Sequence, residues 1–273
     1  MKKEISWPGN APAAAMVSVM LDAEFIWLEM DPIEFGVPKH RSMGEYGPRR
    51  GVDKILDSLK KYHIKATFFV PGVATEVYPD VIKKIYDDGH EIALHGYNHE
   101  KFSRLTYEDQ TEVLEKGKKA LAKLTGVQPK GFRLPEGEAR VDSIRAIAEA
   151  GFLYDSSFFD NDIPYIVDGT EMVEIPMRWE TVDFPYLAWG GSYPKGASRV
   201  AIYDDVLDNW LREMEAYRNG GFCYGITFTP QLIGSPGRRF MIDKVLEKLV
   251  MKRFWIATGE EIAQHVKGGL FEK

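Results

Sequence analysis

Short apolar segments alternate along the chain with longer segments whose apolar residues recur at helical spacing. Residues 14–22, A-A-M-V-S-V-M-L-D, are almost continuously apolar, which predicts a buried strand that ends in a carboxylate. Residues 52–62, V-D-K-I-L-D-S-L-K-K-Y, place apolar side chains on one face of a helix. Strands that alternate with helices of this length predict a parallel sheet with helices outside it.

The same pattern continues to the end of the sequence, with glycine or proline at many of the boundaries. The further predicted strands are 66–70, 91–95, 131–135, 174–179, 222–229 and 254–257. The further predicted helices are 78–90, 105–126, 141–150, 204–217 and 240–251. Residues 156–200 are rich in proline, glycine and aromatics, and we expect long loops there over one face of the sheet.

The length of 273 residues, 44% of them hydrophobic, is enough for one large core. We therefore expect an α/β protein with a single domain over residues 1–273. A (β/α) barrel is the first choice, and an open doubly wound sheet is the second. No G-x-G-x-x-G follows the first strand and no G-x-x-x-x-G-K-[ST] occurs, so the sequence gives no support for a dinucleotide or P-loop site.

The formal charge of -6 is spread over interspersed acidic and basic residues. Without a basic stripe, we expect no nucleic-acid partner and no membrane partner. Cys223 is the only cysteine and lies in an apolar segment, which favours a buried, inert thiol and excludes an internal disulfide. The sequence shows neither a signal-peptide pattern nor a long apolar run, so we expect a cytoplasmic protein. It leaves homo-oligomer formation open.

Polar side chains follow several predicted strands. Asp22 ends the first strand, His95 and His99 follow the third, and Arg133 and Pro135 close the fourth. The carboxyl ends of parallel strands share one edge of a sheet, so these residues are expected to gather there. Two imidazoles and one carboxylate can hold a divalent ion and leave positions open. The histidine spacing alone favours two solvated loop residues, whereas the strand-end position and the preceding Asp22 favour a metal site.

The segment D-D-G-H-E-I-A-L-H-G-Y-N-H-E, residues 87–100, resembles the second motif of the polysaccharide deacetylases. This is the carbohydrate esterase family 4 group, which includes chitin and peptidoglycan deacetylases. Residues 60–72, 131–137 and 151–157 resemble further motifs of the family in the same order. The resemblance covers about residues 14–160. It implies a distorted (β/α) barrel of the polysaccharide deacetylase type, and metal-dependent hydrolysis of non-peptide C–N bonds, such as removal of N-acetyl groups from amino sugars.

The resemblance also implies roles for single residues. Asp22, His95 and His99 would hold Zn²⁺, or another divalent metal such as Co²⁺, Ni²⁺ or Mn²⁺. Asp22 matches the family's metal aspartate or, in another register, its catalytic base, and Arg133 matches the arginine that orients the base. The residues expected to contact a carbohydrate or small-molecule substrate are Pro135, Glu136, Tyr97, Asp162 and Trp189.

Two positions depart from the family pattern. The first motif usually carries two aspartates, whereas residues 19–24, V-M-L-D-A-E, contain only Asp22. Glu24 is our catalytic candidate for the missing carboxylate, and Glu136, Glu138 and Asp162 are alternatives. The last motif usually supplies a histidine as general acid, and Thr229 stands in its place. A threonine cannot shuttle a proton near neutral pH as imidazole does.

These departures leave three functions open. The first is a deacetylase with substitute acid and base groups. The second is a hydrolase of small amides, ureides or cyclic imides, because His95-Gly96-Tyr97 resembles the His-Gly-[Tyr/Trp] form of allantoinase-like relatives. The third is a catalytically impaired relative that binds carbohydrate.

Overall fold

A computed structural model of the protein describes residues 5–30, 38–188 and 201–271. Its strands form one curled, nine-stranded sheet with the order β6-β7-β5-β4-β3-β2-β1-β8, and β9 also pairs with β1. Neighbouring strands run parallel except β6 and β7. The strands are β1 (Ala14–Met20), β2 (Thr67–Val70), β3 (Glu91–Leu94), β4 (Gly131–Phe132), β5 (Tyr154–Asp155), β6 (Tyr165–Ile166), β7 (Val173–Glu174), β8 (Cys223–Phe228) and β9 (Trp255–Ile256).

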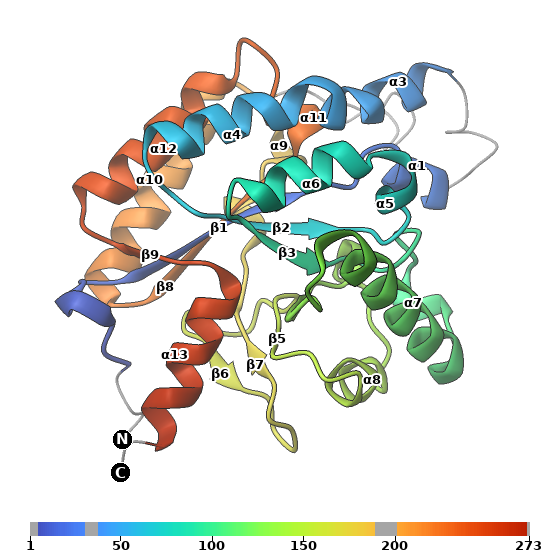
Figure 1. Cartoon of the computed structure of the whole chain (residues 1–273). Coiled ribbons are helices and arrows are strands. Elements are labelled where there is room, and N and C mark those ends of the chain that lie inside the picture. Colours follow the sequence, from blue (N-terminus) through green and yellow to red (C-terminus); the bar gives the residue numbers. More distant parts are fainter. Residues whose placement is uncertain (1–4, 31–37, 189–200, 272–273) are drawn as a thin grey trace.

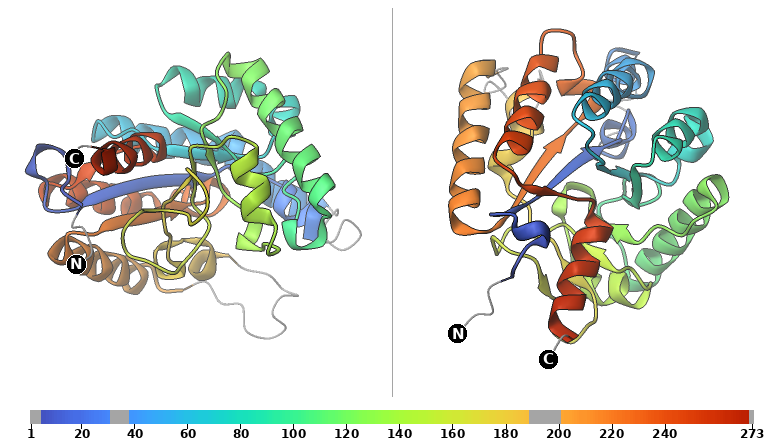
Figure 2. Two further views of the ribbon diagram at one scale, coloured as in Figure 1. Left: turned by 90° about the horizontal axis from the view of Figure 1, so that it is seen from below. Right: turned by 60° about the vertical axis from the view of Figure 1, so that its left-hand side comes forward.

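Helices cover the outside of this sheet (Figure 1), and Figure 2 shows from two further sides how they follow its curl. The helices are α1 (Phe25–Met30), α3 (Pro38–Tyr46), α4 (Val52–Lys61), α5 (Ala74–Val77), α6 (Pro79–Asp87), α7 (Tyr107–Thr125), α8 (Ser143–Glu149), α9 (Phe184–Leu187), α10 (Tyr203–Gly220), α11 (Pro230–Ile233), α12 (Arg239–Met251) and α13 (Gly259–Phe271). Short turns are η1 (Pro8–Asn10), the π-helical η2 (Gly47–Gly51), η3 (Phe102–Arg104), η4 (Pro135–Gly137) and η5 (Trp179–Thr181). None of the described helices combines the length and the hydropathy needed to span a bilayer.

The distorted (β/α) barrel predicted from the resemblance is confirmed. β1 is an inner strand of the sheet, and every residue of it but the last is buried. Neighbouring strands flank it, and packed side chains cover both its faces. The predicted strand 174–179 is wrong in extent, since β7 ends at Glu174 and η5 begins at Trp179. Pro176, which has no amide hydrogen, lies in the intervening segment. The single domain over 1–273 stays a prediction.

α7 packs directly against the end of β3 through Gly117. A Cβ on Gly117 would lie 2.6 Å from a methyl carbon of Leu94 and 3.3 Å from the carbonyl oxygen of Gly96. Only a residue without a side chain allows so close an approach. α7 itself is fixed by a capping box in which Thr106 and Asp109 bond reciprocally, and it ends at Gly126, which has the left-handed conformation.

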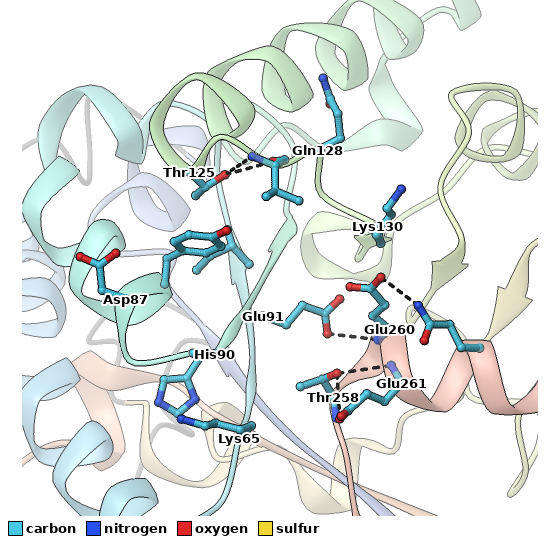
Figure 3. Close-up of a pocket in the computed structure, with 15 residues that line it drawn as sticks. Lys65, Asp87, His90, Glu91, Thr125, Gln128, Lys130, Thr258, Glu260 and Glu261 are labelled. Carbon is cyan, nitrogen blue, oxygen red and sulfur yellow. Dashed lines mark hydrogen bonds between the residues drawn. The ribbon is translucent and has the colours of Figure 1, made fainter.

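Glu91, the first residue of β3, makes several hydrogen bonds at the end of the sheet where β2 and β3 begin. Its buried carboxylate accepts hydrogen bonds from the hydroxyls of Thr67 and Tyr154 and from the amide of Glu260 at the start of α13. An open pocket of about 750 Å³ lies beside it, and Figure 3 shows Lys65, Glu91 and Glu260 among its lining residues. Because β2 and β3 begin here, this pocket is at the other end of the strands from Asp22 and His95.

Candidate metal centre

Asp22, His95 and His99 meet at the carboxyl end of β1 and β3. Oδ1 of Asp22 lies 3.5 Å from Nε2 of His95 and 3.9 Å from Nε2 of His99. One ligand atom from each of the three lies within 4.8 Å of the others. Two ligand atoms at about 2.1 Å from a tetrahedral ion are about 3.4 Å apart, so small side-chain movements would close this cluster around a divalent metal.

The backbone positions both histidines. Nδ1 of His95 lies 2.7 Å from the carbonyl oxygen of Arg133. A carbonyl can only accept, so Nδ1 carries the hydrogen and Nε2 presents its lone pair to Asp22. His99 follows after Gly96, and both have a φ of +69°. This left-handed conformation is costly for histidine and bends the loop back so that the second ring reaches the first. The rings are perpendicular, with centroids 4.9 Å apart.

A bound cation would satisfy the buried polar atoms of the cluster. Among the described residues, Oδ1 of Asp22 and Nε2 of His95 are buried without a hydrogen-bond partner, and so is Nδ1 of His99, the ring nitrogen other than the one that lies 3.9 Å from Asp22. Such atoms are costly unless another group satisfies them. Burial lowers the pKa of His95 and lowers that of His99 to about 3, so both rings are neutral and ready to bind metal near pH 7. The three residues therefore fit a divalent ion.

Asp22 itself needs positive charge nearby. Burial, followed by the charge of Asp183, raises its pKa to about 8, and Glu136 adds to this, whereas Arg133 opposes it. A carboxyl in this environment holds its proton at neutral pH, and a divalent cation displaces that proton on binding. Metal uptake and proton release are thus linked at Asp22.

The side chain of Arg133 lies inside the barrel and forms no ion pair with the described residues. Its guanidinium donates to the carbonyl and hydroxyl oxygens of Ser156 and to the hydroxyl of Ser18, and it stacks at 4.0 Å over the ring of Phe69. Burial lowers its pKa to about 10. The expected pairing of Arg133 with a site carboxylate is not among the ion pairs of the described residues, because these hydroxyl and carbonyl oxygens take its donors. Its charge still acts on Asp22 over a longer distance.

Asp183 is the carboxylate that the sequence analysis missed. It is buried, and it accepts 2.7 Å hydrogen bonds from the amide and from the hydroxyl of Thr229. Burial raises its pKa to about 7, against the lowering effect of the Thr229 bonds. Its position between the apolar Val182 and Phe184 was the available signal, because a lone acid in such a setting faces the interior.

Two of the predicted residues are engaged elsewhere. Both carboxylate oxygens of Glu24 lie within 3.0 Å of the hydroxyl of Tyr78, so Glu24 is held toward the start of α6 and is not the second carboxylate acting on Asp22. The ring of Tyr97 is buried against Gly72, and its hydroxyl bonds with Glu76. These contacts give Tyr97 a packing role between α5 and α7 and leave no free group for substrate.

Asp162 lies near the amino end of β1 and β8, away from the metal cluster. Its carbonyl accepts from the amide of Cys223, the first residue of β8, and its side chain accepts from Tyr217. Cys223 pairs with Ala14, eight residues before Asp22 and roughly 26 Å away along the extended chain. Asp162 was expected at the site because it resembled a substrate-loop residue, but its loop turns back along the barrel. Trp189 lies outside the described residues.

The η4 turn does reach the site. Pro135 is buried and packs 3.2 Å from the position of a Cβ on Gly96, and the carboxylate of Glu136 acts on Asp22. Glu136 has a φ of +56° and pairs with Lys101 at 2.6 Å. Glu138 accepts from Ser103 at 3.3 Å, away from the metal cluster. Pro135 and Glu136 therefore remain candidates for substrate contact, whereas Glu138, an alternative for the missing carboxylate, bonds with Ser103.

Comparison with known proteins places this arrangement in a family. The sequence model of the polysaccharide deacetylases matches residues 44–154, which include both histidines and Arg133. A peptidoglycan deacetylase-like protein of Gibberella zeae is 31% identical over 88% of this chain and 68% of its own length. The chain belongs to the polysaccharide deacetylase family. A peptidoglycan deacetylase of Helicobacter pylori is 28% identical over 78% of this chain and 82% of its own.

Solved structures share the whole architecture. A polysaccharide deacetylase structure from Mycobacterium smegmatis superimposes with a TM-score of 0.92 at 32% identity, over 98% of this chain and 94% of that one. The structure of an allantoinase gives a TM-score of 0.84 at 23% identity, over 97% of this chain and 93% of that one. At that identity the second match shows a common fold only. Both structures share the curled-sheet fold of this member of the polysaccharide deacetylase family.

Proposed function

We propose that this protein is a metal-dependent deacetylase that removes N-acetyl groups from amino sugars. The observation that carries the proposal is the buried cluster of Asp22, His95 and His99 at the carboxyl edge of the sheet, in which Oδ1 of Asp22 and Nε2 of His95 lack hydrogen-bond partners. The similarity to peptidoglycan deacetylases over most of the chain supports amide hydrolysis on a carbohydrate. Zn²⁺ is our proposed resident ion, because a donor set of two imidazoles and one carboxylate is typical of catalytic zinc.

The bound metal would supply activated water and polarise the amide carbonyl. The protein's own residues prepare for this. The Arg133 carbonyl holds His95 in the tautomer that presents Nε2 to the metal. The buried guanidinium of Arg133 adds fixed positive charge behind Asp22, which favours the ionised carboxylate. The walls of the site are buried side chains, and this low-dielectric setting strengthens each of these interactions.

Proton transfer needs a group other than Thr229, and we propose Asp183. It is a carboxyl close enough to raise the pKa of Asp22, and its own pKa lies near 7. A general acid or base works best when its pKa is near the working pH. The two bonds from Thr229 fix its orientation, so that the threonine at the histidine position would act by positioning Asp183. Glu24 is less suited because its charge is not among those that shift the pKa of Asp22.

Acetate release from N-acetylglucosamine oligomers by the Zn²⁺-loaded protein tests the proposal. We expect chelator-sensitive release in the native protein, and we expect His95→Ala to lose both the activity and the stoichiometric metal. His265→Ala is a matched control, because that histidine bonds with the carbonyl of Ser6, far from Asp22 in the fold. Native protein that retains no metal, or activity that is unchanged in His95→Ala, would contradict the proposal.

Assays of the same metal-loaded protein distinguish the other two candidate functions. A small-molecule hydrolase would open cyclic imides or ureides and release no acetate from sugars. A catalytically impaired relative would bind N-acetylglucosamine oligomers without cleaving any substrate. The cytoplasmic location stays a prediction, and homo-oligomer formation stays open.

A further inference from the structure

Two acidic side chains lie together inside the protein, on β5 and β7, the strands that follow β4 in the sheet. Asp155 and Glu174 are paired in register, and both are fully buried. Oδ2 of Asp155 and Oε2 of Glu174 are buried oxygens that receive no hydrogen bond from the described residues. Two ionised carboxylates cannot bond with each other, because each can only accept. One hydrogen held between these two oxygens would satisfy both.

The other two oxygens of the pair hold the backbone that follows β5. Oε1 of Glu174 accepts hydrogen bonds from the amides of Ser157 and Phe158, at 3.0 and 2.9 Å. Oδ1 of Asp155 accepts from the hydroxyl of Ser157 at 2.8 Å, and that hydroxyl accepts in turn from the amide of Leu134 at 2.9 Å. These bonds connect the pair to the start of the η4 turn, and they leave Oδ2 and Oε2 as the oxygens between which the hydrogen lies.

Glu174 is the partner that keeps this hydrogen. Burial raises the pKa of both carboxyl groups. The charge of Asp155 and the hydrogen bond between the two groups raise the pKa of Glu174 further, whereas this bond lowers the pKa of Asp155. Tyr165 of β6 also lies near the pair, but its hydroxyl donates to Asp160. At neutral pH the pair therefore carries one hydrogen and one negative charge.

The segment that the pair holds also holds Arg133. Nε of Arg133 donates to the carbonyl oxygen of Ser156 at 2.7 Å, and a terminal nitrogen donates to the hydroxyl of Ser156 at 2.8 Å. Burial lowers the pKa of the guanidinium, and the charges of Asp155 and Glu174 oppose this. The carbonyl oxygen of the same arginine lies 2.7 Å from Nδ1 of His95. A chain of contacts thus runs from the carboxyl pair through Ser156 and Arg133 to a histidine of the metal cluster.

We propose that Asp155 and Glu174 are positioning residues of the metal centre, which share one hydrogen and supply the single negative charge that balances the buried guanidinium of Arg133. The same pair fixes the backbone of Ser156 and Ser157, on which that guanidinium is held. A neutral pair would leave Arg133 as an unbalanced buried charge, and a second negative charge would place two like charges side by side. This inference rests on the proposed function for the metal that the centre holds.

The test compares the affinity for Zn²⁺ of Glu174→Gln, Asp155→Asn and the double variant, measured by competition with a chromophoric chelator. Each single variant keeps a donor hydrogen between the two side chains and one negative charge, so its Kd should stay within about twofold of the native value. The double variant has no charge beside Arg133, and its Kd should rise roughly tenfold or more. Glu180→Gln changes an exposed acid and is the control.

Infrared spectroscopy of the zinc-loaded proteins at neutral pH detects the shared hydrogen directly. The C=O band of protonated carboxyl groups should lose one group's intensity in Glu174→Gln and none in Glu180→Gln. An unchanged band in Glu174→Gln would overturn the proposal, and so would losses of Zn²⁺ affinity in the single variants that add up to the loss in the double variant. If the double variant does not fold, the band decides together with the single variants, and a tenfold loss of Zn²⁺ affinity in either one overturns the proposal.

Failure of the proposed function gives a different result. If the native protein binds Zn²⁺ but releases no acetate from N-acetylglucosamine oligomers, the deacetylase proposal falls. The infrared band and the Zn²⁺ affinities do not depend on turnover, so they still decide whether Asp155 and Glu174 position the metal centre.

Discussion

Asp183 accepts hydrogen bonds from both the amide and the hydroxyl of Thr229, each 2.7 Å long. The strand that ends at Phe228 therefore delivers no imidazole to the site, but it fixes a carboxyl there instead. These bonds orient the carboxyl group of Asp183, whose charge raises the pKa of Asp22. Under the proposed function, the acid–base group of the site is thus contributed by a different segment from the one that carries Thr229.

Asp183→Asn should lower kcat roughly 100-fold or more, because the amide cannot transfer the proton. The metal content should stay at the native level, since Asp183 is not among the three ligands. Thr229→Ser keeps the hydroxyl and should remain close to native, whereas Thr229→Val should lose part of the activity. Steady-state kinetics and metal analysis on the same samples check this, and native kcat in Asp183→Asn would rule out the role.

Zinc should stabilise the protein against heat. A ligand that binds only the folded state, at a concentration 100 times its Kd, adds about 2.7 kcal/mol to the free energy of unfolding. For a chain of this size that corresponds to a rise in Tm of roughly 5–10 °C. Asp22→Asn removes one of the three ligands and should abolish most of this rise. Thermal scans with chelator and with Zn²⁺ measure it; an equal rise in both proteins would place the ion elsewhere.

Glu174→Gln should make stability less dependent on pH. Asp155 and Glu174 are paired across β5 and β7, and burial, then the charge of Asp155, raises the pKa of Glu174 well above 4.5. The folded state therefore holds a proton that the unfolded chain releases above about pH 4.5, so this contribution is present at low pH and is lost as the pH rises.

Urea unfolding between about pH 5 and pH 8 measures the effect. The native midpoint should fall across this window, and the fall should be smaller in Glu174→Gln, whose amide can donate to Asp155. Glu180→Gln, an exposed change, is the control and should follow the native curve. Parallel curves for native and Glu174→Gln would contradict the assignment.

Gly117→Ala should destabilise the protein by about 1–3 kcal/mol, because the new methyl group would overlap with Leu94 directly before His95. The displaced loop should also hold metal more weakly. Gly268→Ala is the matched control, since that helical glycine has open space around it, and alanine there should be neutral or stabilising by up to about 1 kcal/mol. Chemical unfolding of both variants separates overlap from helix propensity.

The sequence predicted the architecture because its elements have strong periodic patterns. β1 and α7 were recognised within a few residues, and Asp22, His95 and His99 were placed together by their position after strands. β5 and β6 were not predicted, since two-residue strands have no periodicity of their own. α13 was missed because its first turn of G-E-E follows the last strand without a loop signal.

The rest of the site depends on contacts that no local pattern carries. Asp183 reaches Thr229 across 46 residues of sequence, and Arg133 reaches Ser18 across 115. Glu24 was a reasonable expectation from its closeness to Asp22, but Tyr78 binds it instead. Asp162 was expected at the site from its resemblance to a substrate-loop residue, whereas its loop runs back to Cys223.

β1, the strand that precedes Asp22, pairs with β2, which follows it in the chain, and with β8 and β9, which come late in the chain. Pairing of Ala14 with Cys223 closes a loop of about 200 residues, and the entropy of that closure must be offset before its contacts form. During synthesis all three ligand residues leave the ribosome long before β8 does. Metal capture is therefore expected to be a late event in folding, after the last strands have docked.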